Sequence, residues 1–152
     1  MPQPKIKVQL KKFHPDAIVP KYKSEMAAAF DLHAFIPEYV NGLLLSPGES
    51  AIIPTEIGIF LNNPDYCLEI WERSGLGARG IGRRAGLVDA DYQGRIGVVL
   101  TNHNNFSFAI YHTDRIAQAK VAPVQRVIFS VVNEFDTITK RGTGGFGSTG
   151  TN

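Results

Sequence analysis

The chain has 152 residues and a formal net charge of +2, which suits one domain that buries its own core without structural metals. So small a charge excludes an electrostatic argument for a nucleic-acid partner, and the single cysteine, Cys67, excludes an intrachain disulfide. The apolar runs are too short to span a membrane, and residues 1–12 lack the hydrophobic region of a signal peptide. We therefore expect a soluble, cytoplasmic protein that binds neither membranes nor nucleic acid, with Cys67 as a buried, inert thiol.

Alternation of apolar and polar residues predicts strands in four segments. They are Ile6–Leu10, Tyr66–Ile70, Ile96–Leu100 and Phe106–Ile110. Turn signals separate such runs, namely Asn41–Gly42, Ser46–Gly48, Asn62–Asp65 and Asn102–Asn105. With 15 Gly and nine Pro, the chain has little room for helices, and only Lys23–Ala29 has a brief helical pattern. The predicted fold is all-β, a jelly-roll barrel or sandwich.

The stretch Gly86–Gly94 places two acids and a tyrosine at a tight turn between apolar runs. Asp89 and Asp91 are two residues apart, so they point to the same face if strand geometry continues through them. In that case one carboxylate is a candidate base and the other its support. An ordinary aspartate-rich turn is the alternative interpretation, because Asp and Gly are standard turn formers.

Two further segments have the chemistry of anion binding. Arg73–Gly75 follows the strand that ends at Trp71, which brings together a guanidinium, a hydroxyl and a free backbone N–H. Gln118, in Arg115–Gln118, can donate to a phosphate oxygen. The alternatives are a solvent-facing arginine at a strand end and an ordinary outward-pointing glutamine. The four histidines show no metal-ligand spacing, so we expect them to be structural or surface residues.

The chain ends in a glycine-rich segment, Arg141–Asn152, that contains too little apolar surface to order itself. We therefore divide the chain into a domain of residues 1–140 and a flexible arm of residues 141–152. The spacing of Gly142, Gly144 and Gly147 matches a dinucleotide fingerprint, but no helix can follow it. The arm does offer backbone N–H groups and Arg141 to phosphates and Phe146 to a planar base. The alternative is a flexible end without a role.

In their order along the chain, these segments resemble the five motifs of the trimeric dUTPase family. The matching segments are Ala27–Ala34, Arg73–Leu76, Gly86–Gly94, Arg115–Gln118 with Pro123–Val124, and Arg141–Gly150. The resemblance covers nearly the whole chain. It implies hydrolysis of dUTP to dUMP and pyrophosphate, which limits uracil in DNA and supplies dUMP for thymidylate synthesis. It also implies a jelly-roll homotrimer with active sites shared between subunits.

The resemblance assigns roles to individual residues. Asp89 would deprotonate the water that attacks the α-phosphorus, and Tyr92 would pack on the deoxyribose where a 2′-hydroxyl would clash. Backbone groups of Leu87, Val88 and Gly97 would recognise the uracil edge. The α- and β-phosphates would be bound by Arg73, Ser74, Gly75 and Gln118. The arm would bring Phe146 over the base, with Arg141, Gly147, Ser148 and Thr149 also binding the nucleotide. Mg²⁺ would be held by the substrate phosphates, with Asp31 reaching it through water and no direct protein ligand.

Four residues depart from the family pattern. Ala29 and Thr113 stand where glycine is usual, Glu72 stands where proline usually precedes Arg73, and Arg83 lies near a usual asparagine. Glu72 either turns away from the phosphate site or pairs with a nearby arginine.

Three other functions are compatible with parts of this pattern. A dCTP deaminase shares the fold but needs a glutamate where this chain has Val99. A catalytically idle, nucleotide-gated interaction module would not need Asp89 or the arm. A structural jelly-roll protein would leave the arm and the Arg73–Gly75 turn unexplained.

Overall fold

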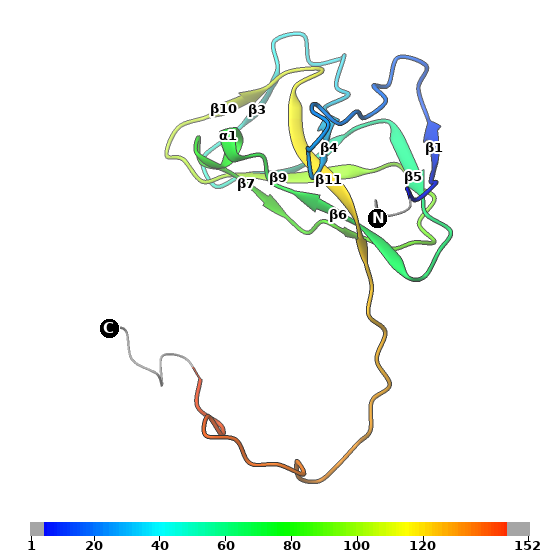
Figure 1. Ribbon diagram of the computed structural model, residues 1–152. Coiled ribbons are helices and arrows are strands. Elements are labelled where there is room, and N and C mark those ends of the chain that lie inside the picture. Colours follow the sequence, from blue (N-terminus) through cyan, green and yellow to red (C-terminus); the bar gives the residue numbers. More distant parts are fainter. Residues whose placement is uncertain (1–4, 146–152) are drawn as a thin grey trace.

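The computed structural model describes residues 5–145. Regular structure in that range is almost entirely β-strand, which confirms the all-β prediction, and the helix described there is a single turn. The elements are β1 (Gln9–Lys12), β2 (Phe30–His33), β3 (Leu43–Leu45), β4 (Ser50–Pro54), β5 (Ile57–Phe60), β6 (Tyr66–Trp71), α1 (Ser74–Gly77), β7 (Ile81–Arg84), β8 (Leu87–Val88), β9 (Gly97–Asn102), β10 (Phe108–Ile110) and β11 (Arg115–Pro123). Figure 1 shows the strands gathered in one body, which the chain leaves after β11.

The strands of residues 5–145 form four antiparallel sheets. The largest has the order β2-β11-β6-β8, the second has the order β4-β9-β7, and the pairs β1-β5 and β10-β3 complete the set. β11 is the longest strand and pairs with β2 on one side and with β6 on the other. Within residues 5–145, β8 pairs only with β6, so it is an edge strand of this sheet, and it lies inside the Gly86–Gly94 stretch.

Inward-pointing aliphatic residues of these sheets form one core. In β9, Val98 and Leu100 alternate with half-exposed residues, as a strand with one buried face requires. Each fully buried aliphatic side chain contributes about 1.5–3 kcal/mol relative to an exposed one. The largest fully buried side chains are Leu32, Ile36, Leu45, Ile53, Ile57, Leu68, Ile81, Ile96, Val98, Leu100, Ile110 and Ile116.

The turn that follows β9 is organised by a buried amide. Asn102 is fully buried, and its Nδ2 donates to the carbonyl oxygens of Leu45 at 2.9 Å and Phe106 at 2.7 Å. Its Oδ1 accepts the backbone N–H of Asn104 at 3.0 Å. The side chain therefore satisfies its hydrogen bonds while closing the Asn102–Asn105 turn that the sequence predicts.

Two of the four predicted strands, which correspond to β6 and β9, are recovered nearly in full, whereas β10 begins only at Phe108 and β1 only at Gln9. The predicted helical segment Lys23–Ala29 is wrong. It forms turns, and Tyr22 and Phe30 on either side of it pair as an isolated antiparallel bridge. A segment of this length has little helical stability of its own, so the strand pairing at its ends decides its conformation.

After β11 the chain extends away from the strands, as a C-terminal extension of residues 124–145 (Figure 1). Its beginning is tied to the loop before β6, because the Val124 N–H donates to the Asp65 carbonyl oxygen at 2.8 Å. The C-terminal extension exposes many large apolar side chains, among them Val127, Ile128, Phe129, Val131, Phe135 and Ile138. Residues 5–145 contain no helix long and apolar enough to cross a membrane.

Candidate active site

The first part of the site is a buried carboxylate held by two arginines. Asp31 on β2 is 8% exposed, and its two oxygens face the Nε of Arg73 at 3.0 Å and an Nη of Arg115 at 3.2 Å. β11 places Arg115 opposite His33 on β2, and Arg73 follows the end of β6. Arg73 also donates to the Arg115 carbonyl oxygen at 3.1 Å. Because a buried charge needs partners, the two arginines stabilise Asp31, and the carboxylate in turn orients both guanidinium groups.

Gln118 and Glu72 lie next to this cluster. Gln118 stands opposite Trp71 in the β11–β6 pairing, and its Nε2 donates to the Glu72 carbonyl oxygen at 2.7 Å. The Glu72 carboxylate accepts the backbone N–H of Arg83 on β7 at 3.0 Å. The carboxylate thus binds a main-chain group, and no arginine side chain of residues 5–145 forms an ion pair with it. Glu72 therefore fastens the segment before Arg73 to β7.

Ser74 and Gly75 begin α1. Arg73 occupies the N-cap position with extended dihedrals, and its carbonyl oxygen accepts the N–H groups of Leu76 and Gly77 at 3.0 and 2.9 Å. The first N–H groups of such a turn have no partner within it. A Cβ built on Gly75 would meet no atom within 4 Å, so there is open space beside these groups. Arg73, Ser74, Gly75 and Gln118 are thus brought together at one end of β6.

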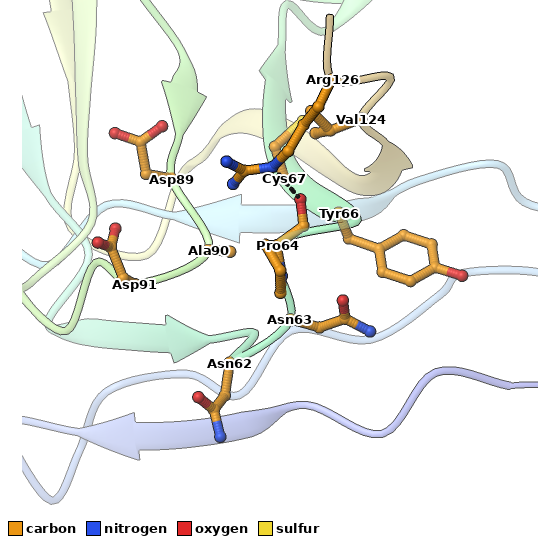
Figure 2. A pocket seen from close by; sticks show the side chains of 10 residues that line it. All are labelled: Asn62, Asn63, Pro64, Tyr66, Cys67, Asp89, Ala90, Asp91, Val124 and Arg126. Carbon is orange, nitrogen blue, oxygen red and sulfur yellow. Dashed lines mark hydrogen bonds between the residues drawn. The ribbon is translucent and has the colours of Figure 1, made fainter. Parts of the chain in front are cut away.

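The second part of the site is the loop between β8 and β9. Strand geometry ends at Val88, and Asp89–Tyr92 form a turn in which the Tyr92 N–H donates to the Asp89 carbonyl oxygen at 3.2 Å. The alternation that would place Asp89 and Asp91 on one strand face is therefore absent. Both carboxylates nevertheless line one pocket of about 410 Å³, together with Asn62, Asn63, Tyr66 and Arg126 (Figure 2).

A smaller pocket of about 210 Å³ lies beside the same loop. Its lining consists of Leu87, Val88, Asp89, Tyr92, Arg95, Ile96 and Gly97. Four of these, Leu87, Val88, Tyr92 and Gly97, are residues that the resemblance assigns to the base and sugar of a nucleotide, and Asp89 is the residue that it assigns as the general base. Tyr92 is fixed within it, because its hydroxyl donates to the Arg95 carbonyl oxygen at 2.9 Å. Arg95 lies one residue beyond the Gly86–Gly94 stretch, and the resemblance gives it no role in the site.

The two parts of the site lie at different positions along β6, one beside its middle and the other at its end. Val88 pairs with Leu68 near the middle of that strand, whereas Gln118 pairs with Trp71 at its end. From Leu68 to Trp71 the strand advances three residues, which corresponds to roughly 10 Å at the rise of a strand, and Arg73 lies beyond the end of the strand. The pockets that Asp89 lines share no residue with the pocket that Arg73 and Arg115 line. Within one chain, Asp89 and the predicted phosphate ligands are therefore separated.

Cys67 lies close to Asp89 and is buried, as the sequence predicts. Burial raises the pKa of the Cys67 thiol above its ordinary value, and the negative charges of Glu69 and Asp89 act in the same direction. The thiol is therefore protonated and weakly nucleophilic near neutral pH.

Two histidines have structural roles: the Nδ1 atoms of His112 and His14 accept the backbone N–H groups of Ile36 and Asp16, each at 3.1 Å. Residues 5–145 contain no group of three or more His, Cys, Asp or Glu side chains that could hold a metal ion. Of the predicted arm residues, Arg141 is exposed in a turn, where its Nε donates to the Gly144 carbonyl oxygen at 3.2 Å. Phe146, Gly147, Ser148 and Thr149 lie outside the described residues.

Comparison with known proteins decides the family. A family model described as dUTPase matches residues 15–150. The chain belongs to the dUTPase family. The resemblance seen in the five motifs is therefore confirmed, and with it the enzyme class, a nucleotidohydrolase.

The relatives of this dUTPase cover nearly its whole length. It is 40% identical over 149 residues to the deoxyuridine 5′-triphosphate nucleotidohydrolase of Hahella chejuensis, covering 96% of this chain and 95% of that protein. It is 42% identical over 135 residues to the enzyme of the same name from Neisseria meningitidis serogroup C, covering 87% of each.

Solved structures agree in fold. A Staphylococcus bacteriophage 80alpha dUTPase with dUpNHpp superposes with a TM-score of 0.83 at 23% identity, over 96% of this chain and 99% of that one. A mutant dUTPase from phage phi11 of S. aureus, described as coordinating a structural Mg(II) ion, has a TM-score of 0.76 at 19% identity, over 86% and 99%. The predicted jelly-roll fold is therefore confirmed.

Proposed function

We propose that this chain hydrolyses dUTP to dUMP and pyrophosphate, with Asp89 as the general base. Asp89 would accept a proton from water while the water oxygen attacks the α-phosphorus and the bond to the β-phosphate oxygen breaks. Phosphoryl transfer requires mainly positioning and charge stabilisation from the protein. The observation that carries the proposal is the pocket that joins Asp89 to Tyr92 in a chain of the dUTPase family. In the cytoplasm, the reaction would limit uracil in DNA and supply dUMP for thymidylate synthesis.

The pocket beside β8 suits a deoxyuridine. Because β8 is an edge strand, the outer backbone groups of Leu87 and Val88 are free to exchange hydrogen bonds with a uracil edge. Gly97 begins β9 on the other side of the pocket, where its backbone can contribute as well. Tyr92, held through its hydroxyl, would present its ring to the sugar and leave no space for a 2′-hydroxyl.

The cluster at the end of β6 suits the phosphates. Arg73 keeps a partly exposed guanidinium after pairing with Asp31, and a guanidinium can bind more than one acceptor. Ser74 and Gly75 follow Arg73 directly in the chain, and Gln118 lies opposite Trp71, two residues before it. These groups would bind the α- and β-phosphates by charge-assisted hydrogen bonds. Arg141, Phe146, Gly147, Ser148 and Thr149 would close over the nucleotide from the arm of residues 141–152.

The residues present fit an indirect role toward Mg²⁺. Each Asp31 oxygen forms an ion pair with an arginine. Its remaining lone pairs can accept a hydrogen bond from a metal-bound water. The two ion pairs make the carboxylate poorly suited to a direct bond with the metal. The triphosphate would therefore supply the direct ligands, and Asp31 would bind the hydration shell. When bound, the ion neutralises phosphate charge and fixes the shape of the triphosphate.

We further infer a homotrimer with shared active sites. The separation of Asp89 from Arg73 along β6 supports this, because a second copy can bring its phosphate-binding cluster to the Asp89 pocket of the first. The C-terminal extension of residues 124–145 supports a trimer independently. A row of apolar side chains exposed to water, such as Ile128, Phe129 and Ile138, is unfavourable unless another chain covers it. The mass of the purified protein in solution tests the trimer directly.

Pyrophosphate release measured with dUTP, dCTP, dTTP and UTP in the presence of Mg²⁺ tests the function. We expect release from dUTP alone at an appreciable rate. Ammonia release from dCTP would instead support a deaminase. Binding of dUTP without turnover would support a nucleotide-gated interaction module. Failure to release pyrophosphate from dUTP refutes the proposal.

A further inference from the structure

We propose that Glu56, Arg95 and Phe13 form a clamp that positions Tyr92 and thereby sets the discrimination between 2′-deoxy and 2′-hydroxy nucleotides. The inference rests on the proposed function, and it identifies specificity-determining residues outside the five motifs. All three are positioning residues, because they act through Tyr92. The clamp joins the loop after β8 to the junction of β4 and β5 and to the end of β1.

Glu56 has an unusual backbone conformation. It lies in the two-residue connection between β4 and β5, with a φ of 54°. This left-handed region is unfavourable for a residue with a Cβ, and such residues persist where the surrounding structure holds them. The Glu56 side chain is only 19% exposed and points to one partner, the Nε of Arg95 at 2.9 Å. The unfavourable conformation thus delivers a carboxylate to the active-site loop.

Arg95 is held from a second direction by an aromatic ring. Its guanidinium carbon lies 4.6 Å from the centre of the Phe13 ring, within the range of a cation–π interaction. Phe13 in turn is fixed by its backbone, because its N–H donates to the Glu56 carbonyl oxygen at 2.9 Å. Glu56 therefore contacts both Arg95 and Phe13, and the three residues form a closed set of contacts.

Backbone hydrogen bonds on either side of Glu56 extend the clamp to the next residue of the loop. The Ile96 N–H donates to the Ile57 carbonyl oxygen at 2.8 Å. The Ile96 carbonyl oxygen accepts the Thr55 N–H at 3.2 Å and the buried Thr55 hydroxyl at 2.7 Å. Residues 95–96 are thus fastened to residues 55–57 by three hydrogen bonds and an ion pair.

Tyr92 is the point at which the clamp reaches the pocket. Its hydroxyl donates to the carbonyl oxygen of Arg95, the residue that Glu56 and Phe13 hold. A Cβ built on Gly94 would clash with that hydroxyl oxygen, so the tyrosine lies tightly against the loop backbone. A displacement of Arg95 therefore moves the Tyr92 ring. Because the ring marks the boundary that a 2′-hydroxyl would cross, its position determines how strongly UTP is rejected.

The experiment measures kcat/KM for dUTP and for UTP with the full-length chain and its variants. Glu56→Gln removes the charge of the ion pair, and Arg95→Met removes the guanidinium while keeping a long side chain. We expect each to lower the preference for dUTP over UTP by about tenfold or more, since small displacements at a reacting centre have effects of that size. Glu49→Gln is the matched control. Its carboxylate accepts a backbone N–H from Ser46 in a distant turn, and we expect an unchanged preference.

Glu56→Gly separates a positioning role from a structural one. Glycine adopts a φ of 54° without strain, so we expect an unchanged or higher melting temperature together with a weaker preference for dUTP. Replacement of a residue that served only stability would not weaken the preference for dUTP while the melting temperature stayed the same or rose. Arg95→Lys keeps a cation near Glu56 and Phe13, so we expect it to retain more of the preference than Arg95→Met.

The outcomes distinguish this inference from the function on which it rests. A wild-type chain that hydrolyses dUTP, with wild-type preference in Glu56→Gln and Arg95→Met, overturns the clamp and leaves the proposed function intact. A wild-type chain that leaves dUTP unhydrolysed overturns both. If those two variants fail to fold, Phe13→Leu supplies the same comparison, because it removes the ring and keeps the ion pair. A preference equal to wild type in that variant also contradicts the clamp.

Discussion

Asp31 and Arg73 form an ion pair with 3.0 Å between Oδ1 and Nε, although 41 residues lie between them in the sequence. The pair exists because β11 lies between β2 and β6 in one sheet, which brings the Asp31 strand close to the end of the strand before Arg73. It holds the guanidinium that the proposed function assigns to phosphate binding. The carboxylate is therefore part of the phosphate-binding cluster as well as the proposed partner of the Mg²⁺ hydration shell.

Asp31→Asn should lower the free energy of unfolding by about 2 kcal/mol, because it leaves two arginines without their buried partner and solvent screens part of that loss. Urea unfolding at a fixed protein concentration measures the change. Glu69→Gln is the control, since it breaks a solvent-screened ion pair with Lys120 at 3.3 Å and should cost much less than Asp31→Asn. Equal losses in the two variants would contradict the role given to Asp31.

Asp89→Asn should retain dUTP binding and lose most of the turnover rate, by about 100-fold or more, because an amide cannot accept the proton of the attacking water. Asp91→Asn is a close control, since Asp91 lines the same larger pocket but does not line the pocket that contains Tyr92. We expect a much smaller effect from it. Single-turnover measurements together with dUTP titration check both variants, and a fully active Asp89→Asn would disprove the general-base assignment.

Deletion of residues 141–152 should leave a folded protein with the same number of subunits and severely reduced turnover. Residues 141–145, the described part of this segment, contribute no strand to the sheets, so we expect the fold to form without the segment. Twelve residues extend at most about 40 Å, which is long enough to reach the cleft of a neighbouring subunit. Circular dichroism, solution mass and pyrophosphate release check the three parts of this expectation. Unchanged turnover would argue against the arm as a lid.

Cys67 should react slowly with iodoacetamide in the native protein near pH 8 and rapidly in urea. Its raised pKa also has a consequence for stability. The unfolded thiol ionises at lower pH than the folded one. The contribution of Cys67 to the free energy of unfolding is therefore complete below the pKa of the unfolded thiol. It declines as the pH rises through that pKa towards the higher pKa of the folded thiol.

Asp89→Asn removes one of the negative charges that raise the pKa of Cys67, so the native thiol of that variant should ionise at lower pH. An unchanged alkylation profile would contradict the proximity of the two side chains.

Local patterns identified four of the eleven strands of residues 5–145, in whole or in part, and the groups to which we assign the chemistry. Alternation predicted β6 and β9 because one buried face imposes a period of two, and the motifs marked Asp89, Tyr92, Arg73 and Gln118 by residue type and order. Patterns of this kind failed where a distant partner decides the conformation. Lys23–Ala29 is an example, since the pairing of Tyr22 with Phe30 overrides its helical pattern.

Long-range contacts decided the rest, for a physical reason. A short segment specifies its own dihedral preferences and its polarity, but strand pairing and ion pairing depend on which other segments the sheet order places nearby. Only the folded chain shows that two arginines hold Asp31, that Glu72 binds the backbone of β7, and that Glu56 reaches Arg95 from a left-handed backbone conformation. The separation of Asp89 from Arg73 along β6 is likewise a property of the sheet, since no local pattern records how far apart two motifs lie in space.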